Sequence, residues 1–302
     1  MMNFVLIALC LLAGFFVKKY KGLPEDSYKS VNAWVINVAL PAVALKYIPE
    51  IQWNFSLILP FLMPLLVWTG SYLFFNFLNR YISMSPGTRA ALFLTAGLGN
   101  TSFLGFPLTE AYYGSEGLQI AILCDQATFI VMATLGIITA TKASNGGIFL
   151  MKQILKKILT FPPFIAFALA FILPLFITLD PIIPLLNGLA LTLIPLALFS
   201  VGMQLRIRTW RTDARLISFA LLYKLILAPL FILLLGIIFN LSGITVKTTI
   251  FEAAMAPMVT GAIIATDYNL NPKLANIILS VGIPLSLVTT FLWSVIIELF
   301  VI

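Results

Sequence analysis

The stretch GLGNT, at residues 97–101, interrupts an apolar run that covers residues 88–113 and is long enough to span a bilayer. A second apolar run, residues 246–267, carries AMAPMVTG at residues 254–261. Glycine, asparagine and proline disfavour the helix interior, so each stretch predicts a broken helix. Main-chain groups freed in hydrocarbon are costly unless protein or trapped water satisfies them. Two broken helices at matching positions are typical of the binding site of a membrane transporter.

The composition places the chain in a membrane. Hydrophobic residues make up 61% of the 302 residues and charged residues 10%, whereas a soluble domain is about half apolar and about a quarter charged. We therefore expect an all-α integral membrane protein. The chain has no histidine, and Cys10 and Cys124 lie in apolar runs. The sequence thus predicts no metal site and no cofactor, apart from H⁺ or Na⁺ as a coupling ion.

Ten apolar segments have about the length of a transmembrane helix: residues 1–17, 30–48, 55–78, 88–113, 117–140, 159–179, 182–204, 213–239, 246–267 and 274–300. Between them, only Lys46 and Lys247 fall in the loops of one side. The loops after the odd-numbered spans hold Lys18, Lys19, Lys21, Lys29, Arg80, Arg89, Lys142, Lys152, Lys156, Lys157, Arg206, Arg208, Arg211, Arg215 and Lys273. Cytoplasmic loops carry the excess of basic residues, so both termini are predicted outside a plasma membrane or bacterial inner membrane. The net charge of +7 then gives no reason to expect nucleic-acid binding.

A polar connection at residues 141–158 divides the chain into two halves of five spans, residues 1–140 and 159–302. Because five is odd, the second half must enter the membrane from the opposite side, which predicts an inverted repeat with helices four and nine crossing. Pro41 in span two and Pro195 in span seven are predicted structural breaks at matching positions. The second half of the connection either lies along the cytoplasmic interface or extends span six.

The two breaks carry groups that suit an anion. Asn100 is a good N-cap residue and predicts the start of the second half-helix of span four, and Pro257 suits a first helical turn. Helix N-termini carry partial positive charge and bind anions. We therefore predict a substrate site made by Gly99, Asn100, Thr101, Pro257, Thr260 and Gly261. The alternative is a pair of kinks whose main-chain groups are satisfied by neighbouring helices.

Charged residues inside spans are candidates for ion coupling. Asp125 lies about 12 Å into span five at about 1.5 Å per residue, next to Gln126, and is a candidate proton or cation site. The alternative is a carboxyl group in a structural hydrogen-bond network. Lys224 in span eight is predicted as a partner of Asp125, as a substrate counter-charge, or as a side chain that snorkels to the interface. Glu252 suits either an interfacial position or the site.

Four stretches resemble the auxin efflux carrier family of permeases. GLGNTSFLGFPLTEAYYG, residues 97–114, is similar to the signature of that family's fourth helix, and AMAPMVTGAIIATDYNLNP, residues 254–272, is similar to its second crossover. NVALPAVAL in span two and LIPLALFSVGMQL in span seven fit its scaffold helices. The resemblance covers essentially the whole chain.

The resemblance implies a fold like those of the bile acid symporters and sodium/proton antiporters, with spans 1, 2, 6 and 7 as a scaffold and spans 3–5 and 8–10 as a moving transport domain. It implies carriage of organic acids, with the family's crossover asparagine matched by Asn100. The family often has proline where this chain has Gly99, and the plant carriers have glutamine near the position of Asp125, so a more flexible break and ion coupling are implied here. The short connection between spans five and six implies the microbial type.

The sequence therefore predicts a secondary or facilitative transporter of small organic anions, such as auxin-like carboxylates or dicarboxylates, and no enzyme. One alternative is a cation/proton antiporter on the same fold, with Asp125 and Lys224 as its ion site. Another is a membrane sensor that binds a ligand without moving it. The expected partners are the anion and the lipid bilayer, and the scaffold surface suits either lipid or a homodimer.

Overall fold

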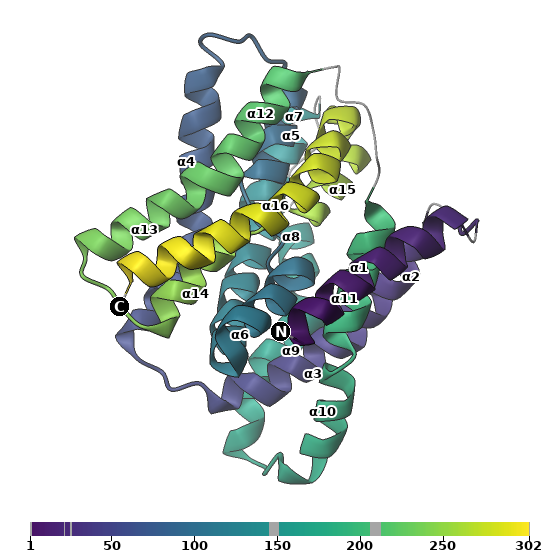
Figure 1. Cartoon of the computed structure of the whole chain (residues 1–302), viewed down its shortest axis with the longest axis vertical. Helices are drawn as coiled ribbons and strands as arrows, with labels where there is room; N and C mark the ends of the chain where they lie inside the picture. Colours follow the sequence, from purple (N-terminus) through teal and green to yellow (C-terminus); the bar gives the residue numbers. More distant parts are fainter. Residues whose placement is uncertain (1, 21, 25, 145–150, 206–212, 302) are drawn as a thin grey trace.

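The computed structural model describes the chain except for residues 1, 21, 25, 145–150, 206–212 and 302. Its described residues form helices and no β-strand (Figure 1). The α-helices of the first half are α1 (Met2–Tyr20), α2 (Ser27–Trp34), α3 (Leu40–Tyr47), α4 (Ile58–Leu78), α5 (Pro86–Ala96), α6 (Phe106–Val131) and α7 (Ile137–Ala143). Those of the second half are α8 (Met151–Leu159), α9 (Pro162–Ile172), α10 (Ile183–Ala190), α11 (Leu193–Gln204), α12 (Ala214–Leu222), α13 (Ala228–Ile238), α14 (Ile244–Ala253), α15 (Val259–Asp267) and α16 (Pro272–Phe300).

Short π-helical and 3₁₀ segments join these helices into longer runs. The π-helices are η1 (Val35–Ala39), η4 (Thr101–Gly105), η5 (Met132–Gly136) and η8 (Tyr223–Leu227), and the 3₁₀ segments are η2 (Ile48–Glu50), η3 (Phe55–Leu57), η6 (Leu173–Leu175) and η7 (Asp180–Ile182). Pro41, Pro107 and Pro229 each stand two residues after the end of a π-helix. Proline has no N–H and its ring crowds the carbonyl four residues earlier, so the preceding turn widens.

The prolines predicted as breaks behave differently from each other. At Pro41 the helix continues without interruption through α2, η1 and α3, so the prediction of a break is wrong there and the helix widens instead. Pro195 lies in the first turn of α11, just after the turn at Leu191 and Thr192 that separates α10 from α11. The two positions therefore match in sequence but not in local structure.

Six helical runs of the described chain are long and apolar enough to cross a membrane: Ser27–Glu50, Phe55–Leu78, Thr101–Ala143, Asp180–Gln204, Ala214–Ile238 and Pro272–Phe300. The run Thr101–Ala143 unites η4, α6, η5 and α7, with a kink at Gly114, whose φ of 69° is readily adopted only by glycine. The other predicted spans also contain helices, but these helices are either interrupted or shorter than the six runs. The protein is thus an all-helical membrane protein, and the number of ten crossings stays a prediction.

Both predicted helix breaks are confirmed, and they pair with each other. The first separates α5, which ends at Ala96, from η4, and the second separates α14 from α15. Gly99 and Pro257 form an antiparallel β-bridge. The N–H of Asn100 donates to the carbonyl of Ala256 (2.9 Å), and that of Met258 donates to Thr95 (3.0 Å). The second break therefore accepts a main-chain bond from the first break and donates one to the last turn of α5, which removes part of the cost of breaking a helix in an apolar environment.

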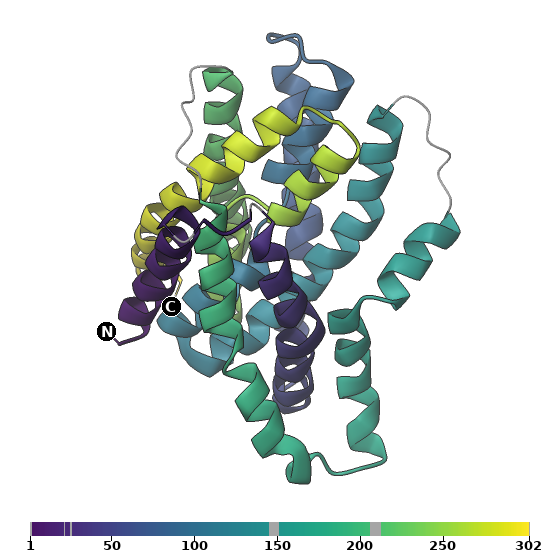
Figure 2. The same ribbon diagram turned by 90° about the vertical axis from the view of Figure 1, so that its right-hand side faces the viewer.

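The remaining helices pack around this crossing in two hydrophobic clusters. The larger cluster includes α4, α5 and α12–α16, and the smaller one lies between α3, α9, α11 and part of α6 (Figures 1 and 2). α1 packs along α11 through Gly14 and Gly202, where an added Cβ would overlap main-chain atoms of the facing helix. Close approach of backbones through small residues is typical of helix pairs in membranes.

Part of the predicted connection and of the basic loops lies outside the described residues, namely residues 145–150 and Lys21, Arg206, Arg208 and Arg211. Helix α8, which carries the second half of the connection, stands at the edge of the molecule (Figure 2). It ends at Leu159 and is separated from α9 by Thr160 and Phe161, so it does not continue span six as one straight helix.

Candidate functional site

A cavity of about 200 Å³ opens beside the crossing. One wall is formed by the crossing itself, by α15 and by the α6–η5 run, and includes Gly99–Phe103, Asp125, Phe129 and Met258–Thr260. The other lining residues come from the α2–η1–α3 run, the N-cap of α9 and the end of α11, and include Asn32, Ile36, Leu40, Phe161 and Gln204. Two groups of helices therefore contribute to the lining of the cavity.

Asn100 stands at the N-terminal end of η4, as predicted, but its side chain does not cap that helix. It is buried, with 4% of its surface exposed, and its Nδ2 has no hydrogen-bond partner. A buried amide without a partner costs free energy. Since Asn100 also lines the cavity, its unpartnered amide is a candidate hydrogen-bond donor to a bound molecule.

Asp125 lines the same cavity and is held by a neighbouring hydroxyl. The Thr101 Oγ1 donates to Asp125 Oδ1 at 2.6 Å. This bond ties the α6 helix to the first turn of η4, because the two residues are 24 positions apart in the sequence. Asp125 is 8% exposed as a residue, so it is nearly buried at the edge of the cavity.

The structure brings Gly99, Asn100, Thr101, Asp125 and Thr260 together around the cavity, while their roles stay predictions. The other predicted residues, Pro257, Gly261, Gln126 and Lys224, are not among its lining residues.

Pro257 precedes Met258, the N-cap residue of α15, and so lies in the extended break and not in the first helical turn that the sequence predicted. Gly261 packs so closely on α5 that a Cβ would overlap the Leu94 carbonyl. Gln126 is buried with its Oε1 unpartnered.

Lys224 and Glu252 correct two expectations. Both are fully buried, at 0% exposure, so Lys224 does not snorkel to an interface and Glu252 is not interfacial. Lys224 Nζ donates to the carbonyl of Ala253 at 2.6 Å, whereas Asp125 bonds Thr101. The Thr109 hydroxyl donates to Glu252 Oε1 at 2.7 Å. Glu252 is eight residues from the start of α14, and sequence depth alone did not reveal that surrounding helices cover it.

The sequence did not predict the apolar part of the cavity. Phe103, Phe129 and Phe161 line it together with Ile36, Leu40, Met132, Ile263 and Ile264. The rings of Phe129 and Phe161 stack with centroids 3.9 Å apart. No motif distinguishes these phenylalanines from the many others in an apolar chain, because their position depends on the packing of α6 against α9.

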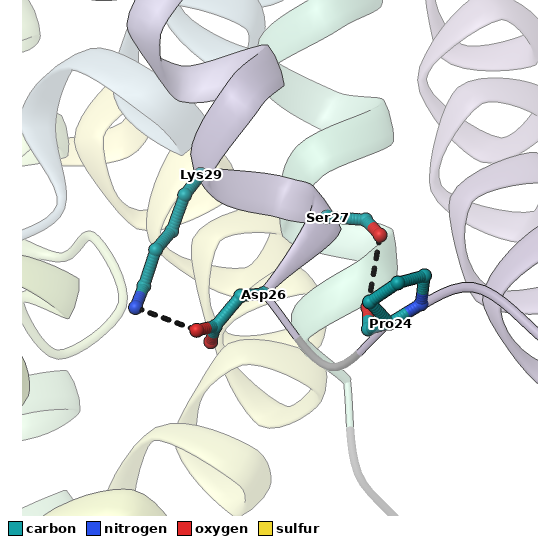
Figure 3. A network of polar contacts seen from close by, with 4 residues as sticks. All are labelled: Pro24, Asp26, Ser27 and Lys29. Carbon is teal, nitrogen blue, oxygen red and sulfur yellow. Dashed lines mark hydrogen bonds and ion pairs between the residues drawn. The ribbon is translucent and has the colours of Figure 1, made fainter.

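A second cavity, of about 260 Å³, adjoins the first and shares Gln204, Val259 and Ile263 with it. Its other lining residues are more polar and include Lys18, Asp26, Lys29, Asp267 and Asn276. Figure 3 shows the rim at the start of α2, where Lys29 Nζ contacts Asp26 at 2.9 Å and Ser27 bonds the Pro24 carbonyl. The central cavity thus adjoins a polar recess on the side of the basic loops.

Comparisons with known proteins agree with this architecture. Residues 1–294 match the family described as membrane transport protein. The chain is similar to an uncharacterized transporter of Methanothermobacter thermautotrophicus, with 29% identity over 96% of each chain. It is also similar to an uncharacterized transporter of Methanocaldococcus jannaschii, with 30% identity over 97% of each chain, and to the uncharacterized transporter YfdV of Escherichia coli, with 26% identity over 95% of this chain and 94% of the relative. The chain therefore belongs to the membrane transport protein family, which is the auxin efflux carrier family of permeases.

Proposed function

We propose that this transporter carries small organic anions, and that the carboxylate of the anion binds beside the crossing. The observation that carries the proposal is that Asn100, a residue that lines the cavity, has a buried Nδ2 with no partner in the protein. A carboxylate oxygen accepts hydrogen bonds and would satisfy this donor. Hydrogen bonds to charged groups contribute about 1.5–3 kcal/mol, more than those between neutral groups.

The two helix ends beside the cavity support an anion as cargo. The N-terminal ends of η4 and α15 both border the cavity. Such ends carry partial positive charge, and their free N–H groups are suited to bind an anion without a basic side chain. The described lining residues of this cavity include no lysine or arginine. The anion would therefore be recognised by neutral donors, which hold it less strongly and release it more readily.

The rest of the cavity favours a monocarboxylate with an apolar body. Its aromatic and aliphatic lining suits a ring or a short alkyl group. Asp125 is the acidic residue among the described lining, and its charge would repel a second carboxylate on the substrate. We expect an aromatic or branched monocarboxylate to bind more tightly than a dicarboxylate of similar size.

We further propose transport by alternating access within ten spans arranged as an inverted repeat. The two cavity walls support this, because one comes from the predicted transport-domain spans and the other from the predicted scaffold spans. Movement of the first wall against the second would expose the cavity to each side in turn. The polar recess beside the basic loops fits an access route on the predicted cytoplasmic side.

The test is uptake by purified protein in liposomes. Labelled aromatic, branched and dicarboxylic acids are offered singly, with protein-free liposomes as the control. We expect saturable uptake of at least one monocarboxylate and competition by other monocarboxylates. Absence of uptake of every organic acid, in protein that remains folded, would contradict the proposal.

The second candidate is a cation/proton antiporter, and Asp125 in the cavity is the observation that favours it. Imposing a gradient of Na⁺ or K⁺ on the same liposomes discriminates between the two functions. Proton movement that follows the cation gradient without any organic acid supports antiport. Proton movement that requires an organic acid supports the anion carrier.

A further inference from the structure

A second buried polar cluster lies at the crossing but outside the central cavity. Its centre is Lys224, in η8, whose side chain is fully buried. The Lys224 Nζ donates to the main-chain carbonyl of Ala253 at 2.6 Å. It also lies against the other break, since a Cβ placed on Gly99 would be 3.3 Å from Nζ. The ammonium group thus touches both broken segments.

The carbonyl that accepts this bond is at the end of a half-helix. Ala253 is the last residue of α14, and the last carbonyls of a helix lack intrahelical partners and carry partial negative charge. Secondary transporters commonly place Na⁺ at half-helix C-terminal ends and at unwound carbonyls near a crossing. In this protein a lysine ammonium, which is a compact and localised charge, occupies such a place.

A carboxylate completes the cluster. Glu252 is fully buried, and its Oε1 accepts a bond from Thr109 while its Oε2 has no partner. The carboxylate lies against the backbone of Gly105 in η4, and Glu252 directly precedes Ala253, whose carbonyl accepts the Lys224 bond. A carboxylate together with main-chain carbonyls is a set of oxygen ligands that suits a hard cation. The cluster therefore has the kind of oxygen atoms that a cation site needs, and the ammonium group of Lys224 already supplies a positive charge there.

We propose that the Lys224 ammonium is a built-in cation that fills an alkali-metal site at the crossing, so that the crossing is held together without bound Na⁺. Because the ammonium is tethered to η8, the site stays filled regardless of the ions in solution. Na⁺ then has no place to bind there, and movement of the substrate is not linked to Na⁺ at this position. The proposal is independent of which substrate is carried.

The experiment measures the melting temperature of the purified protein in NaCl and in N-methyl-D-glucamine chloride of equal concentration. We expect the wild type to melt at the same temperature in both salts. Lys224→Ala removes the charge and opens space among the oxygen atoms, so it should melt several degrees lower in the organic salt and recover at least half of the loss in NaCl. Lys224→Met removes the charge but fills the space, so it should melt lower in both salts.

Two further variants complete the design. Lys224→Met combined with Glu252→Gln should melt higher than Lys224→Met alone, because the carboxylate no longer lacks a counter-charge. Lys247→Ala removes a partly exposed lysine that pairs with Glu298 at 2.6 Å and should show no difference between the salts. This variant is the matched control for loss of a lysine.

Either of two results overturns the proposal. One is a saturable stabilisation of the wild type by Na⁺, because the site would then not be filled by Lys224. The other is a Lys224→Ala variant that melts at the same low temperature in both salts. If Lys224→Ala does not fold, the melting temperatures of the wild type in the two salts still test the proposal. The double variant tests it as well, and it contradicts the proposal if it is less stable than Lys224→Met.

Discussion

Asn100 is a residue at which a substitution should affect function but hardly affect folding. Its buried amide lacks a partner in the protein, so replacing it by alanine removes a group that contributes little to stability. We expect Asn100→Ala to keep or slightly raise the melting temperature and to weaken carboxylate binding by about 10- to 150-fold, the equivalent of about 1.5–3 kcal/mol. Thermal unfolding and uptake by liposomes measure the two effects separately.

Asn37→Ala is the matched control, because Asn37 is exposed and bonds the Ala33 carbonyl of its own helix at 2.7 Å. It should leave uptake unchanged. If Asn100→Ala transported like this control, the assignment of the carboxylate to Asn100 would be wrong.

Asp125 is the residue to test for proton coupling. Asp125→Asn keeps the size of the side chain and an oxygen that accepts the Thr101 bond, but it carries no titratable group. If Asp125 binds the coupled proton, uptake by the variant should vary less between mildly acidic and mildly alkaline pH than uptake by the wild type. Asp180→Asn, at the exposed first residue of η7, is the control. An unchanged pH profile in Asp125→Asn would locate coupling elsewhere.

The sequence predicted local structure correctly where a residue type has a strong backbone preference. Asn100 and Gly99 lie in the break that their conformational preferences predicted. It failed for Lys224 and Glu252, since their burial depends on helices distant in the sequence. Gly261, which was predicted in the substrate site, is not among the residues that line the cavity and packs closely against α5, while its role in binding stays a prediction.

At the scale of elements, the contact between α15 and α5 has a testable energetic role. A Cβ at Gly261 would overlap the Leu94 carbonyl, so Gly261→Ala must push the two half-helices apart. We expect it to destabilise the protein by about 1–3 kcal/mol, as overpacking typically does, and to lower the melting temperature. Gly188→Ala is the control, because nothing lies within 4 Å of a Cβ at Gly188 in α10.

The control should be neutral or stabilising by about 0.5–1 kcal/mol, since alanine favours helix more than glycine. Equal melting temperatures for the two variants would show that the α15–α5 contact is looser than described.

The same scale explains what the sequence predicted about helices and what it missed. Apolar length located helix in each of the ten predicted ranges. Proline was a poorer guide, because in a helix covered by apolar neighbours it widens a turn at Pro41 and Pro229 without ending the helix. The breaks at the crossing needed a different cause, namely a second extended segment that accepts and donates main-chain hydrogen bonds.

At the scale of the whole molecule, the proposed inverted arrangement of the two halves predicts which loops face which side. The wild-type cysteines, Cys10 and Cys124, are buried and should react little with a membrane-impermeant maleimide. We expect Ser85→Cys to be labelled from the cytoplasmic side, and Glu116→Cys and Asn240→Cys from the outside. All three positions are exposed, so labelling in right-side-out and inside-out vesicles reports sidedness.

Labelling of Glu116→Cys and Asn240→Cys from opposite sides would contradict the five-plus-five arrangement. Labelling of all three from the reversed sides would keep the arrangement and invert its orientation in the membrane.

The pairing of the two breaks suggests different roles for the two walls of the cavity, one in recognising the substrate and one in the movement that delivers it. The hydrogen bonds from Asn100 to Ala256 and from Met258 to Thr95 join the two half-sites, so under the proposed alternating access the two half-sites would move together. The helices that carry Asn32 and Gln204 would then be the part of the protein past which this unit moves. Substitutions on the paired wall should alter which molecule is chosen, and substitutions on the facing wall should alter how fast it is delivered.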